Sequence, residues 1–396
     1  MNYTHWIYKE GFTTKLTSCY YILPLSPRSA TLGALLARVL ERGSKEYPTV
    51  EAVNDKMDEL YGAAAFFDVN IYGSYLCFEA RLIMPKYGFL DQPELEEEAR
   101  EFLRSLLYRP LLEKGTFKED FFLQEKEMLA QDIENLYKDP DSYALLRSLE
   151  LIFPDSNLGI YKYGDSRVLK ELSRKDLWDF YQELMQAPLY IYHHSDEKKE
   201  DLGKKGFFPM EKVNNKVTER TCKEDRDVDQ SILIQAYFVP WTYQDPMVYP
   251  LLVVNHLLGG SGTSLLFKEV REEKGLCYSI YSRYDRFRQV LFIMSGYEKE
   301  QGQELVTSIE GVLQALREGN FSDKELADTK QDLCIGIASI PDSQGRHLKD
   351  SFVRDLFGDK KDIESRIEEI KKVEKTDVVK AANSLSRLLS FYVRQK

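Results

Sequence analysis

The feature that most constrains this chain is an internal repeat, because a repeated unit has to fold twice. The first half contains LLARVLERGSKEYPTVEAVNDKMDELYGA, and the second half contains LLVVNHLLGGSGTSLLFKEVREEKGLCYS. Each stretch predicts an apolar helix, a Gly-Ser turn and a second, amphipathic helix that ends near a tyrosine. When Gly43-Ser44 is placed on Gly260-Ser261, Tyr61 falls on Tyr278.

The match continues along both halves in the same order. Segments rich in β-branched and aromatic residues follow each tyrosine, and they predict antiparallel strand pairs with turns near Tyr72-Gly73 and Phe287-Arg288. Further along, Phe117 falls on Phe321, Lys126 on Lys330 and Asp176 on Asp377. Each half closes on a strand-like run, LYIYHH in the first and LSFYVRQ in the second. Two unrelated α+β halves can also show similar patterns of helices and strands. Three matching segments in the same order nevertheless favour duplication.

The repeat predicts an α+β protein with two duplicated domains. Each domain is expected to be a mostly antiparallel sheet with helices packed on one face. The first domain would span residues 1–194 and the second residues 230–396. The segment between them, 195–229, is crowded with Lys, Asp and Glu and contains GKKG, so a solvated linker is expected there.

Composition excludes several classes of function. The net charge of -11 argues against a nucleic-acid partner, since phosphates require a basic face. No apolar run approaches the roughly 20 residues of a membrane span, and the N-terminus does not have the pattern of a signal peptide. The five cysteines are odd in number and scattered, and no CxxC occurs. Reduced thiols in a cytoplasmic protein are therefore expected.

A search for catalytic motifs finds none of the familiar ones. The five histidines form no HExxH, no HxxEH and no Cys-His cluster, and no GxSxG occurs. His193 and His194 are adjacent on an expected strand, so they point to opposite faces and cannot clasp one ion together. His256 stands alone in an apolar helix. The GGSG stretch at residues 259–262 could cradle a phosphate, but it lacks the P-loop ending, and its repeat at Gly43-Ser44 favours a tight turn.

Arg271 and Tyr278 lie across an expected helix-to-strand corner. Arg271 is at the edge of an apolar helical stripe, Gly275 is a plausible helix-ending residue, and Tyr278 begins a strand. Their side chains can converge on one rim of the sheet, where a guanidinium and a hydroxyl suit a carbonyl oxygen or an oxyanion. Arginine and tyrosine pairs can also serve only to cap helices. A binding role and a capping role for Arg271 and Tyr278 therefore both remain open at this point. Cys277 between them is expected to be a buried strand cysteine rather than a redox-sensitive thiol.

The stretch LGGSGTSLLFKEVREEKGLCYSIYS resembles the C-terminal domain motif of the insulinase/pitrilysin family of peptidases, which carry an inverted zinc motif. In that family a Gly-rich turn is followed by an arginine and a tyrosine seven residues apart, as Arg271 and Tyr278 are here. LERGSKEYPTVEAVNDKMDELYGA and NLGIYKYGDSRVLKELSRKDLWDFY are similar to first-half segments of the family. The resemblance covers nearly the whole chain and implies the family's two-domain metallohydrolase-like fold.

The chain departs from the family where active members carry His-x-x-Glu-His before the Gly-Ser/Thr turn. Two histidines at i and i+4 share a helix face and bind zinc, with the glutamate as general base. Those positions hold Ala34, Ala37 and Arg38. The nearest candidate for the family's third, acidic ligand is Asp132. The resemblance therefore implies that this chain binds no catalytic zinc and is no enzyme by itself.

The resemblance implies the zinc-less subunit of a paired bacterial peptidase. Its partner would be a homologous HxxEH-bearing subunit that holds the zinc, in a heterodimer that cleaves peptides. Arg271 and Tyr278 would bind the substrate carbonyl and its oxyanion, and the peptide would add as a strand to a sheet edge. Two alternatives remain: a purely structural or docking subunit, and a zinc-free homodimer that binds peptides.

Overall fold

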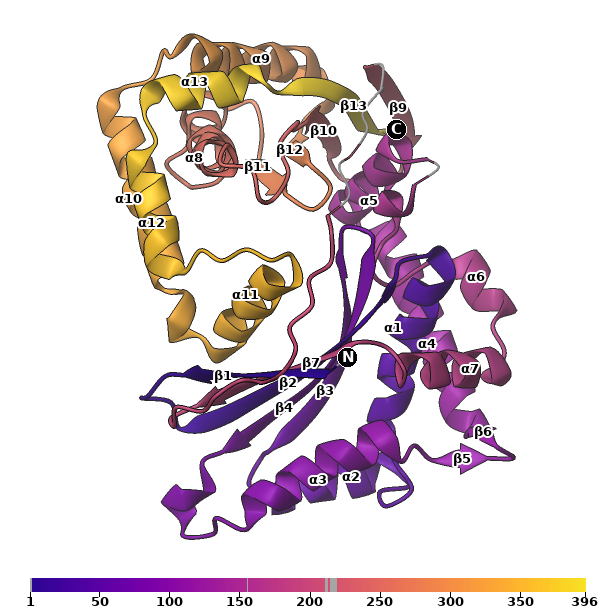
Figure 1. The fold of residues 1–396 in the computed structure, drawn as a ribbon. Helices are drawn as coiled ribbons and strands as arrows, with labels where there is room; N and C mark the ends of the chain where they lie inside the picture. Colours follow the sequence, from indigo (N-terminus) through magenta and orange to yellow (C-terminus); the bar gives the residue numbers. More distant parts are fainter. Residues whose placement is uncertain (1, 155, 211–212, 214–218) are drawn as a thin grey trace. The chain divides into compact units, whose positions relative to one another are not determined.

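The computed structural model describes residues 2–154, 156–210, 213 and 219–396 (Figure 1). The chain forms two compact units. Unit 1 consists of residues 1–135, 160–209 and 341–358, and unit 2 consists of residues 136–159, 210–340 and 359–396. Each unit is built around its own sheet and its own hydrophobic core.

Unit 1 contains a six-stranded sheet. Its strands, in spatial order, are β3 (Ala64–Tyr72), β4 (Tyr75–Pro85), β2 (Thr14–Pro24), β7 (Leu189–Ser195), β1 (Asn2–Tyr8) and β8 (Leu202–Gly203). The β1–β7 pair is parallel and the other pairs are antiparallel. Strand β3 is at one edge, so one side of its backbone is not used by the sheet.

Helices cover both faces of this sheet, whereas the sequence predicted helices on one face only. The helices of unit 1 are α1 (Pro27–Glu41), α2 (Val50–Glu59), α3 (Leu95–Tyr108), α4 (Glu119–Lys138, which ends in unit 2), α6 (Ser166–Glu171), α7 (Arg174–Leu184) and α11 (Gln344–Leu356). Residues of α1, α3 and α7 share one apolar core with β2 and β4. Helix α11 packs on the other face, where the ring of Phe352 stacks on Tyr20 at 3.9 Å between centroids. Figure 1 shows α11 on one side of the sheet and α3 on the other.

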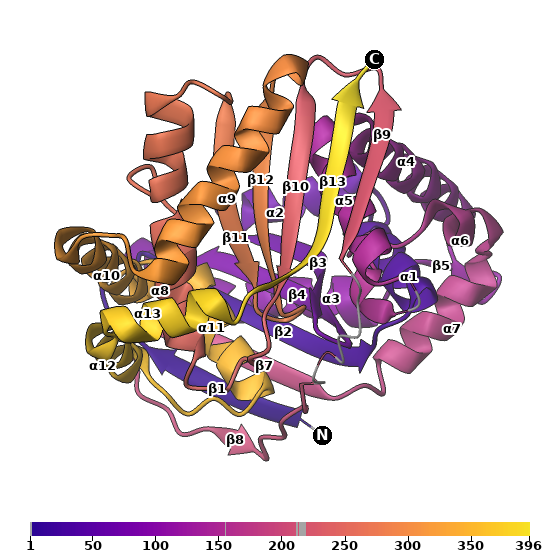
Figure 2. The ribbon, with the colours of Figure 1, turned by 90° about the horizontal axis from the view of Figure 1, so that it is seen from above.

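Unit 2 repeats this sheet. Its strands, in spatial order, are β11 (Ser279–Asp285), β12 (Val290–Tyr297), β10 (Ser231–Phe238), β13 (Ser386–Gln395) and β9 (Arg220–Arg226), visible side by side in Figure 2. The β13–β9 pair is parallel and the other pairs are antiparallel. The order of the first five strands and the place of the parallel pair match those of unit 1, which confirms the predicted α+β fold with a mostly antiparallel sheet in each part.

The helices of unit 2 also lie on both faces of its sheet. They are α5 (Pro140–Ile152), α8 (Val248–Gly259), the π-helix η3 (Phe267–Glu273), α9 (Gly302–Glu318), α10 (Asp323–Ala338), α12 (Ile363–Lys372) and α13 (Lys375–Asn383). Helices α8, α9 and α13 share one core with β10 and β12. Helix α5 packs on the opposite face, where Leu149 and Ile152 join Ile234 and Phe391 in a second cluster.

Matching contacts show that the repeat is structural. The ammonium of Lys126 donates to the carbonyl of Leu172 at 2.7 Å, and that of Lys330 donates to the carbonyl of Val373 at 2.9 Å. Asp176 and Asp377 are each the third residue of a helix with a capping box. In each half, therefore, a lysine satisfies a backbone carbonyl just before a capped helix.

The units are not consecutive halves of the chain. The sequence predicted domains 1–194 and 230–396, whereas α5 from the first half belongs to unit 2 and α11 from the second half belongs to unit 1. The apolar second face of each sheet is covered by a helix from the other half of the chain. Within the predicted linker 195–229, β8 and β9 are strands of the two sheets; residues 211–212 and 214–218 lie outside the described residues.

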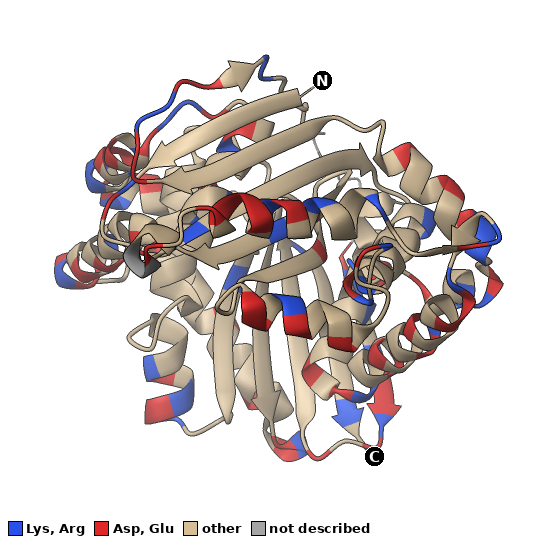
Figure 3. Ribbon diagram, turned by 90° about the horizontal axis from the view of Figure 1, so that it is seen from below, with Lys and Arg blue, Asp and Glu red and all other residues tan. Residues whose placement is uncertain are grey.

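Charged residues gather on the helices and on β9 (Figure 3), whereas the strands β1, β7, β10 and β12 contain none. This pattern follows from the two covered faces of each sheet, because buried strands favour apolar residues on both faces. Within the part of the chain that the structure describes, every helix is too short or too polar to cross a membrane.

Candidate functional site

Helix α1 carries the three positions that the resemblance assigns to the missing zinc motif. Ser26 begins the helix with a capping box, which fixes its first turn. Ala34 and Arg38 are one helical turn apart and share a face, and Ala37 precedes Arg38. Both alanines are buried, at 4% exposure each.

The guanidinium of Arg38 lies between two carboxylates of helix α4. It donates a hydrogen bond to Asp132, and its Nη1 lies 3.8 Å from Oε2 of Glu125. Glu125 and Asp132 are seven residues apart, so two helical turns place them on one face of α4. Arg42 extends the cluster, because its Nη1 lies 3.5 Å from Oε1 of Glu125.

Glu125 is the most buried member of this cluster, at 5% exposure. Burial raises the pKa of Glu125, and the charges of Arg42 and Arg38 oppose that rise without cancelling it. A carboxylate in this environment depends on its two arginines to stay ionised near neutral pH. The ion pairs therefore link α1 to α4.

A pocket of about 450 Å³ opens beside the cluster. Its lining includes Ala34, Ala37 and Arg38 of α1, Glu125 and Met128 of α4, and residues of the edge strand β3. Since alanine has only a methyl group, side chains as large as histidine and glutamate at positions 34 and 37 would project into this space.

These residues do not fit a zinc ion. Ala34 and Ala37 offer no donor atom, and Arg38 adds a fixed positive charge where a cation would bind. Among the described residues, no group of three or more His, Cys, Asp or Glu side chains could hold a metal. The chemistry available at this position is that of an ion-pair cluster.

The predicted corner that carries Arg271 and Tyr278 is in unit 2. The expected amphipathic helix there is the π-helix η3, in which Arg271 is the fifth residue. Gly275 has a φ of 63°, a left-handed conformation that favours glycine and ends the helix. The backbone N–H of Tyr278 then donates to the carbonyl of Gly296, which starts the pairing of β11 with β12.

Arg271 and Tyr278 are both accessible from solvent. The Arg271 side chain is 40% exposed, with its guanidinium carbon 4.6 Å from the centre of the Phe267 ring. Its Nε lies 3.9 Å from Oε1 of Glu272, a distance too long for a firm hydrogen bond. Tyr278 is 58% exposed, and its hydroxyl donates to the carboxylate of Glu298. The Arg271 donors are therefore largely available to a ligand, and the Tyr278 hydroxyl has one protein acceptor.

Tyr278 and Cys277 of this corner are uncharged near pH 7. The hydrogen bond to Glu298 and the negative charge of that carboxylate raise the pKa of Tyr278, so its hydroxyl stays a donor. Burial raises the pKa of the Cys277 thiol, although the positive charge of Arg271 opposes the rise. Cys277 is buried, as the sequence predicted, and an uncharged buried thiol is a poor nucleophile.

Sequence reasoning missed Glu125 and Arg42. Both could have been found from spacing. Arg38 and Arg42 are four residues apart on one expected helix, and Glu125 and Asp132 are seven apart on another. Two cations and two carboxylates on facing helix stripes predict ion pairs, but which helices face each other is a tertiary property.

Comparisons with known proteins give relatives over the whole chain. Residues 195–333 match the family described as "Peptidase M16 inactive domain". A probable inactive metalloprotease, YmfF of Bacillus subtilis (strain 168), is 27% identical over 404 residues, which cover 98% of this chain and 95% of that protein. An uncharacterized zinc protease, YmxG of the same organism, is 32% identical over 148 residues, or 36% of this chain and 34% of that protein.

Solved structures share the fold. A conserved protein from Enterococcus faecalis V583 superposes with a TM-score of 0.88 at 25% identity, covering 99% of this chain and 96% of its own. A peptidase M16 inactive domain from Pseudomonas fluorescens gives a TM-score of 0.80 at 15% identity, with the same coverage. At 15% identity, the similarity to the Pseudomonas fluorescens structure shows only a shared fold.

Proposed function

We propose that this protein is the zinc-less subunit of a heterodimeric zinc metallopeptidase. The proposal starts from the match of residues 195–333 to the Peptidase M16 inactive-domain family and from the likeness of the whole chain to a probable inactive metalloprotease. The family resemblance predicted from the sequence is confirmed at this level. The partner in this proposal is a homologous subunit with an HxxEH motif, and it supplies the zinc.

The observation that carries the proposal is the cluster around Arg38. Ion pairs with Glu125 and Asp132 occupy the place of a zinc ligand set, and the flanking alanines have no donor atoms. The chain thus lacks the means to activate a water molecule for hydrolysis at this position. What it keeps from the family pattern is the pair Arg271 and Tyr278, both exposed.

In the proposed reaction, Arg271 and Tyr278 bind the carbonyl of the scissile bond. The guanidinium and the hydroxyl donate hydrogen bonds to that oxygen, and these bonds strengthen as negative charge develops on it. Tyr278 has to release Glu298 to do so, because one hydroxyl donates one hydrogen bond at a time. The peptide backbone pairs with an edge strand, which binds peptides with modest sequence preference.

The first test compares zinc content and peptidase activity of the chain alone, of the HxxEH partner alone and of the mixture. The proposal expects a zinc-free, inactive chain that increases peptide cleavage by the partner. Stoichiometric zinc and peptide cleavage by the isolated chain would overturn it.

The second test places the substitutions Arg271→Ala and Tyr278→Phe in the complex. Each is expected to lower kcat by about 10²–10³-fold, the loss typical of one oxyanion donor. Tyr61→Phe is the matched control, since Tyr61 is the repeat equivalent of Tyr278 and is 52% exposed. Arg167→Ala controls for loss of an exposed arginine.

The structural or docking subunit is the main rival. One observation favours it, because the bond from Tyr278 to Glu298 gives the tyrosine a role within the fold. If the complex forms and cleaves peptides with an unchanged kcat when both substitutions are present, the structural or docking role is supported. A stable homodimer that ignores the partner during size-exclusion chromatography would instead favour the peptide-binding homodimer.

A further inference from the structure

A second pocket, of about 260 Å³, lies in unit 1 between helix α3 and the sheet. Apolar side chains line most of it: Cys19 of β2, Leu82 of β4, Ile191 of β7, and Leu103, Leu107 and Tyr108 of α3. Burial raises the pKa of the Cys19 thiol to about 12, so this thiol is uncharged. Arg104 of α3 also lines the pocket, and its guanidinium is paired with Glu97 and Glu101. The pocket is just below the usual size range of small-molecule sites, which suits a slender ligand.

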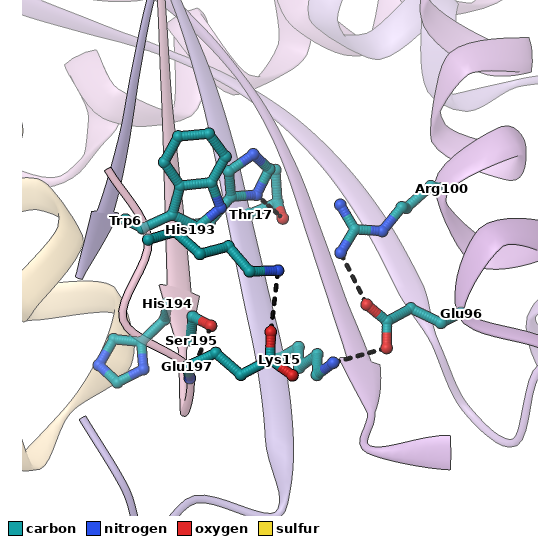
Figure 4. A pocket seen from close by; sticks show the side chains of 10 residues that line it. Trp6, Lys15, Thr17, Glu96, Arg100, His193, His194, Ser195 and Glu197 are labelled. Atoms are coloured by element: carbon teal, nitrogen blue, oxygen red, sulfur yellow. Dashed lines mark hydrogen bonds and ion pairs between the residues drawn. The ribbon is translucent and has the colours of Figure 1, made fainter. Parts of the chain in front are cut away.

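One end of this pocket is polar and cationic. It lies next to a smaller pocket of about 30 Å³, and Thr17, Arg100 and His193 line both pockets. Figure 4 shows these three residues with the others that line the smaller pocket. Figure 4 shows Lys15 and Arg100 reaching the same carboxylate, that of Glu96. Glu96 accepts from Lys15 at 2.6 Å and from Arg100 at 2.7 Å.

The charges at this end do not balance. Three cations, Lys15, Arg100 and Lys199, line the smaller pocket with two carboxylates, Glu96 and Glu197. The Nζ atom of Lys199 lies 3.1 Å from Oε2 of Glu197. Burial raises the pKa of Glu96, but the hydrogen bonds from Lys15 and Arg100 outweigh burial, so its pKa is below the ordinary value. The cations that line the smaller pocket therefore outnumber its carboxylates by one.

His193 adds a flat neutral wall rather than another charge. Its Nδ1 is 2.8 Å from the hydroxyl of Thr17, and its ring stacks on Trp6 at 5.4 Å between centroids. Burial, together with the charges of Arg100 and Lys199, lowers the pKa of His193 to about 4. The polar end therefore has one excess cation beside an aromatic surface.

We propose that these two neighbouring pockets together bind a small amphiphile with an unbranched apolar chain and a terminal anionic group, such as a medium-chain carboxylate. The chain occupies the apolar part between Leu103 and Ile191, where burial of methylene groups is favourable. The anionic group lies beside Arg100 and Lys15, where it completes the charge balance. Nothing in this proposal depends on a zinc-bearing partner or on Arg271 and Tyr278.

The experiment is calorimetric titration of the intact chain at pH 7.5 with decanoate below its micellar concentration. Decyltrimethylammonium has a chain one carbon longer with a cationic group, and acetate has the anionic group without the chain. We expect saturable binding of decanoate with a stoichiometry of one, at least tenfold weaker binding of the cationic amphiphile, and no binding of acetate.

Two kinds of variant locate the site. Arg100→Gln is expected to weaken decanoate binding about tenfold or more, because a charged hydrogen-bond donor is lost. Leu103→Phe fills the apolar part and is expected to abolish binding, with Ile191→Phe as a second filling variant if the first does not fold. Arg167→Gln and Leu123→Phe are matched controls at exposed positions outside both pockets.

Three outcomes would overturn the proposal. Equal affinity for the anionic and cationic amphiphiles would remove the role of the cationic end. Unchanged decanoate binding in folded filling variants would place the ligand elsewhere. A hydrophobic tripeptide with a free carboxylate that displaces decanoate at lower concentration would assign the site to a peptide C-terminus instead of an alkyl chain.

Discussion

Arg38 connects helix α1 to helix α4 through Glu125 and Asp132, and one of these carboxylates is buried. Removing the arginine leaves the buried carboxylate with Arg42 alone. Arg38→Met should therefore lower the free energy of unfolding by about 1–3 kcal/mol, since the cost of an under-compensated buried charge exceeds that of a surface pair. Urea denaturation measures the difference.

The control for this prediction is the exposed helical pair of Lys175 and Asp179. Lys175→Met should cost less than about 0.5 kcal/mol, because exposed i,i+4 pairs contribute little. Equal losses for the two variants would mean that the Arg38 cluster behaves as an ordinary surface pair.

The same positions predict how zinc binding could be rebuilt. The triple substitution Ala34→His, Ala37→Glu, Arg38→His places two histidines one turn apart, and the pocket of about 450 Å³ has room for the larger side chains. Asp132, released from its arginine, is available as a third ligand. We expect about one zinc per chain by atomic absorption after dialysis for this variant, and none for the same variant with Asp132→Asn.

At the scale of elements, helix α11 packs on the sheet of unit 1 through a pair of histidines. His347 of α11 lies 5.6 Å from His194 of β7 between ring centroids, and Phe12 packs edge-on against His194. Burial and the charges of His347, Lys86 and Lys9 lower the pKa of His194 to about 4. Burial also lowers the pKa of His347; Arg354, Lys9 and His5 reinforce this, whereas Asp350 opposes it.

This pair predicts acid sensitivity of α11. A folded pKa below the unfolded value means that the unfolded chain binds more protons between pH 6.5 and 4. Stability should be greatest above pH 6.5 and should fall as pH falls towards 4, by up to about 3 kcal/mol for His194. The protection factors of the α11 backbone amides, which are hydrogen-exchange rates corrected for the intrinsic effect of pH, should fall over the same window.

Two variants separate this effect from general acid unfolding. The double substitution His194→Phe, His347→Leu should flatten the pH dependence of the α11 protection factors. His193→Gln is the comparison, because His193 is on the opposite face of β7 and its pKa is also lowered to about 4. His193→Gln should reduce the dependence of the free energy of unfolding on pH while leaving the α11 protection factors unchanged. If it changes these protection factors as much as the double variant does, the assignment to the pair is wrong.

At the scale of the whole molecule, each unit needs a helix from the other half of the chain. A fragment of residues 1–209 lacks α11 and leaves the apolar face around Tyr20 uncovered. We expect it to bind a hydrophobic dye and to unfold without a cooperative transition. A synthetic peptide of residues 341–358 should bind the fragment and restore the transition, whereas the same peptide with Leu348→Ala and Phe352→Ala should not.

Cooperative, native-like unfolding of the fragment without the peptide would show that α11 is dispensable. Circular dichroism during heating distinguishes the two results. The intact chain provides the reference transition.

The sequence by itself determined the repeated part of this protein. The strand pairs, the Gly-Ser turns, the strand-like ends of both halves and the matched Lys126 and Lys330 all follow from local periodicity and turn chemistry, which act within short stretches. The absence of zinc-ligand residues at Ala34, Ala37 and Arg38 was also readable, because a side chain without a donor atom cannot gain one by folding.

Only the tertiary structure decided which helix covers which sheet face and which charges meet. The amphipathic patterns of α5 and α11 predict that each helix buries one face, but either sheet could cover that face. The pairing of Arg38 with Glu125 across helices, the facing of His194 and His347, and the pocket beneath α3 join residues that are distant in sequence. Such contacts depend on the packing of whole elements, which the local pattern of side chains does not encode.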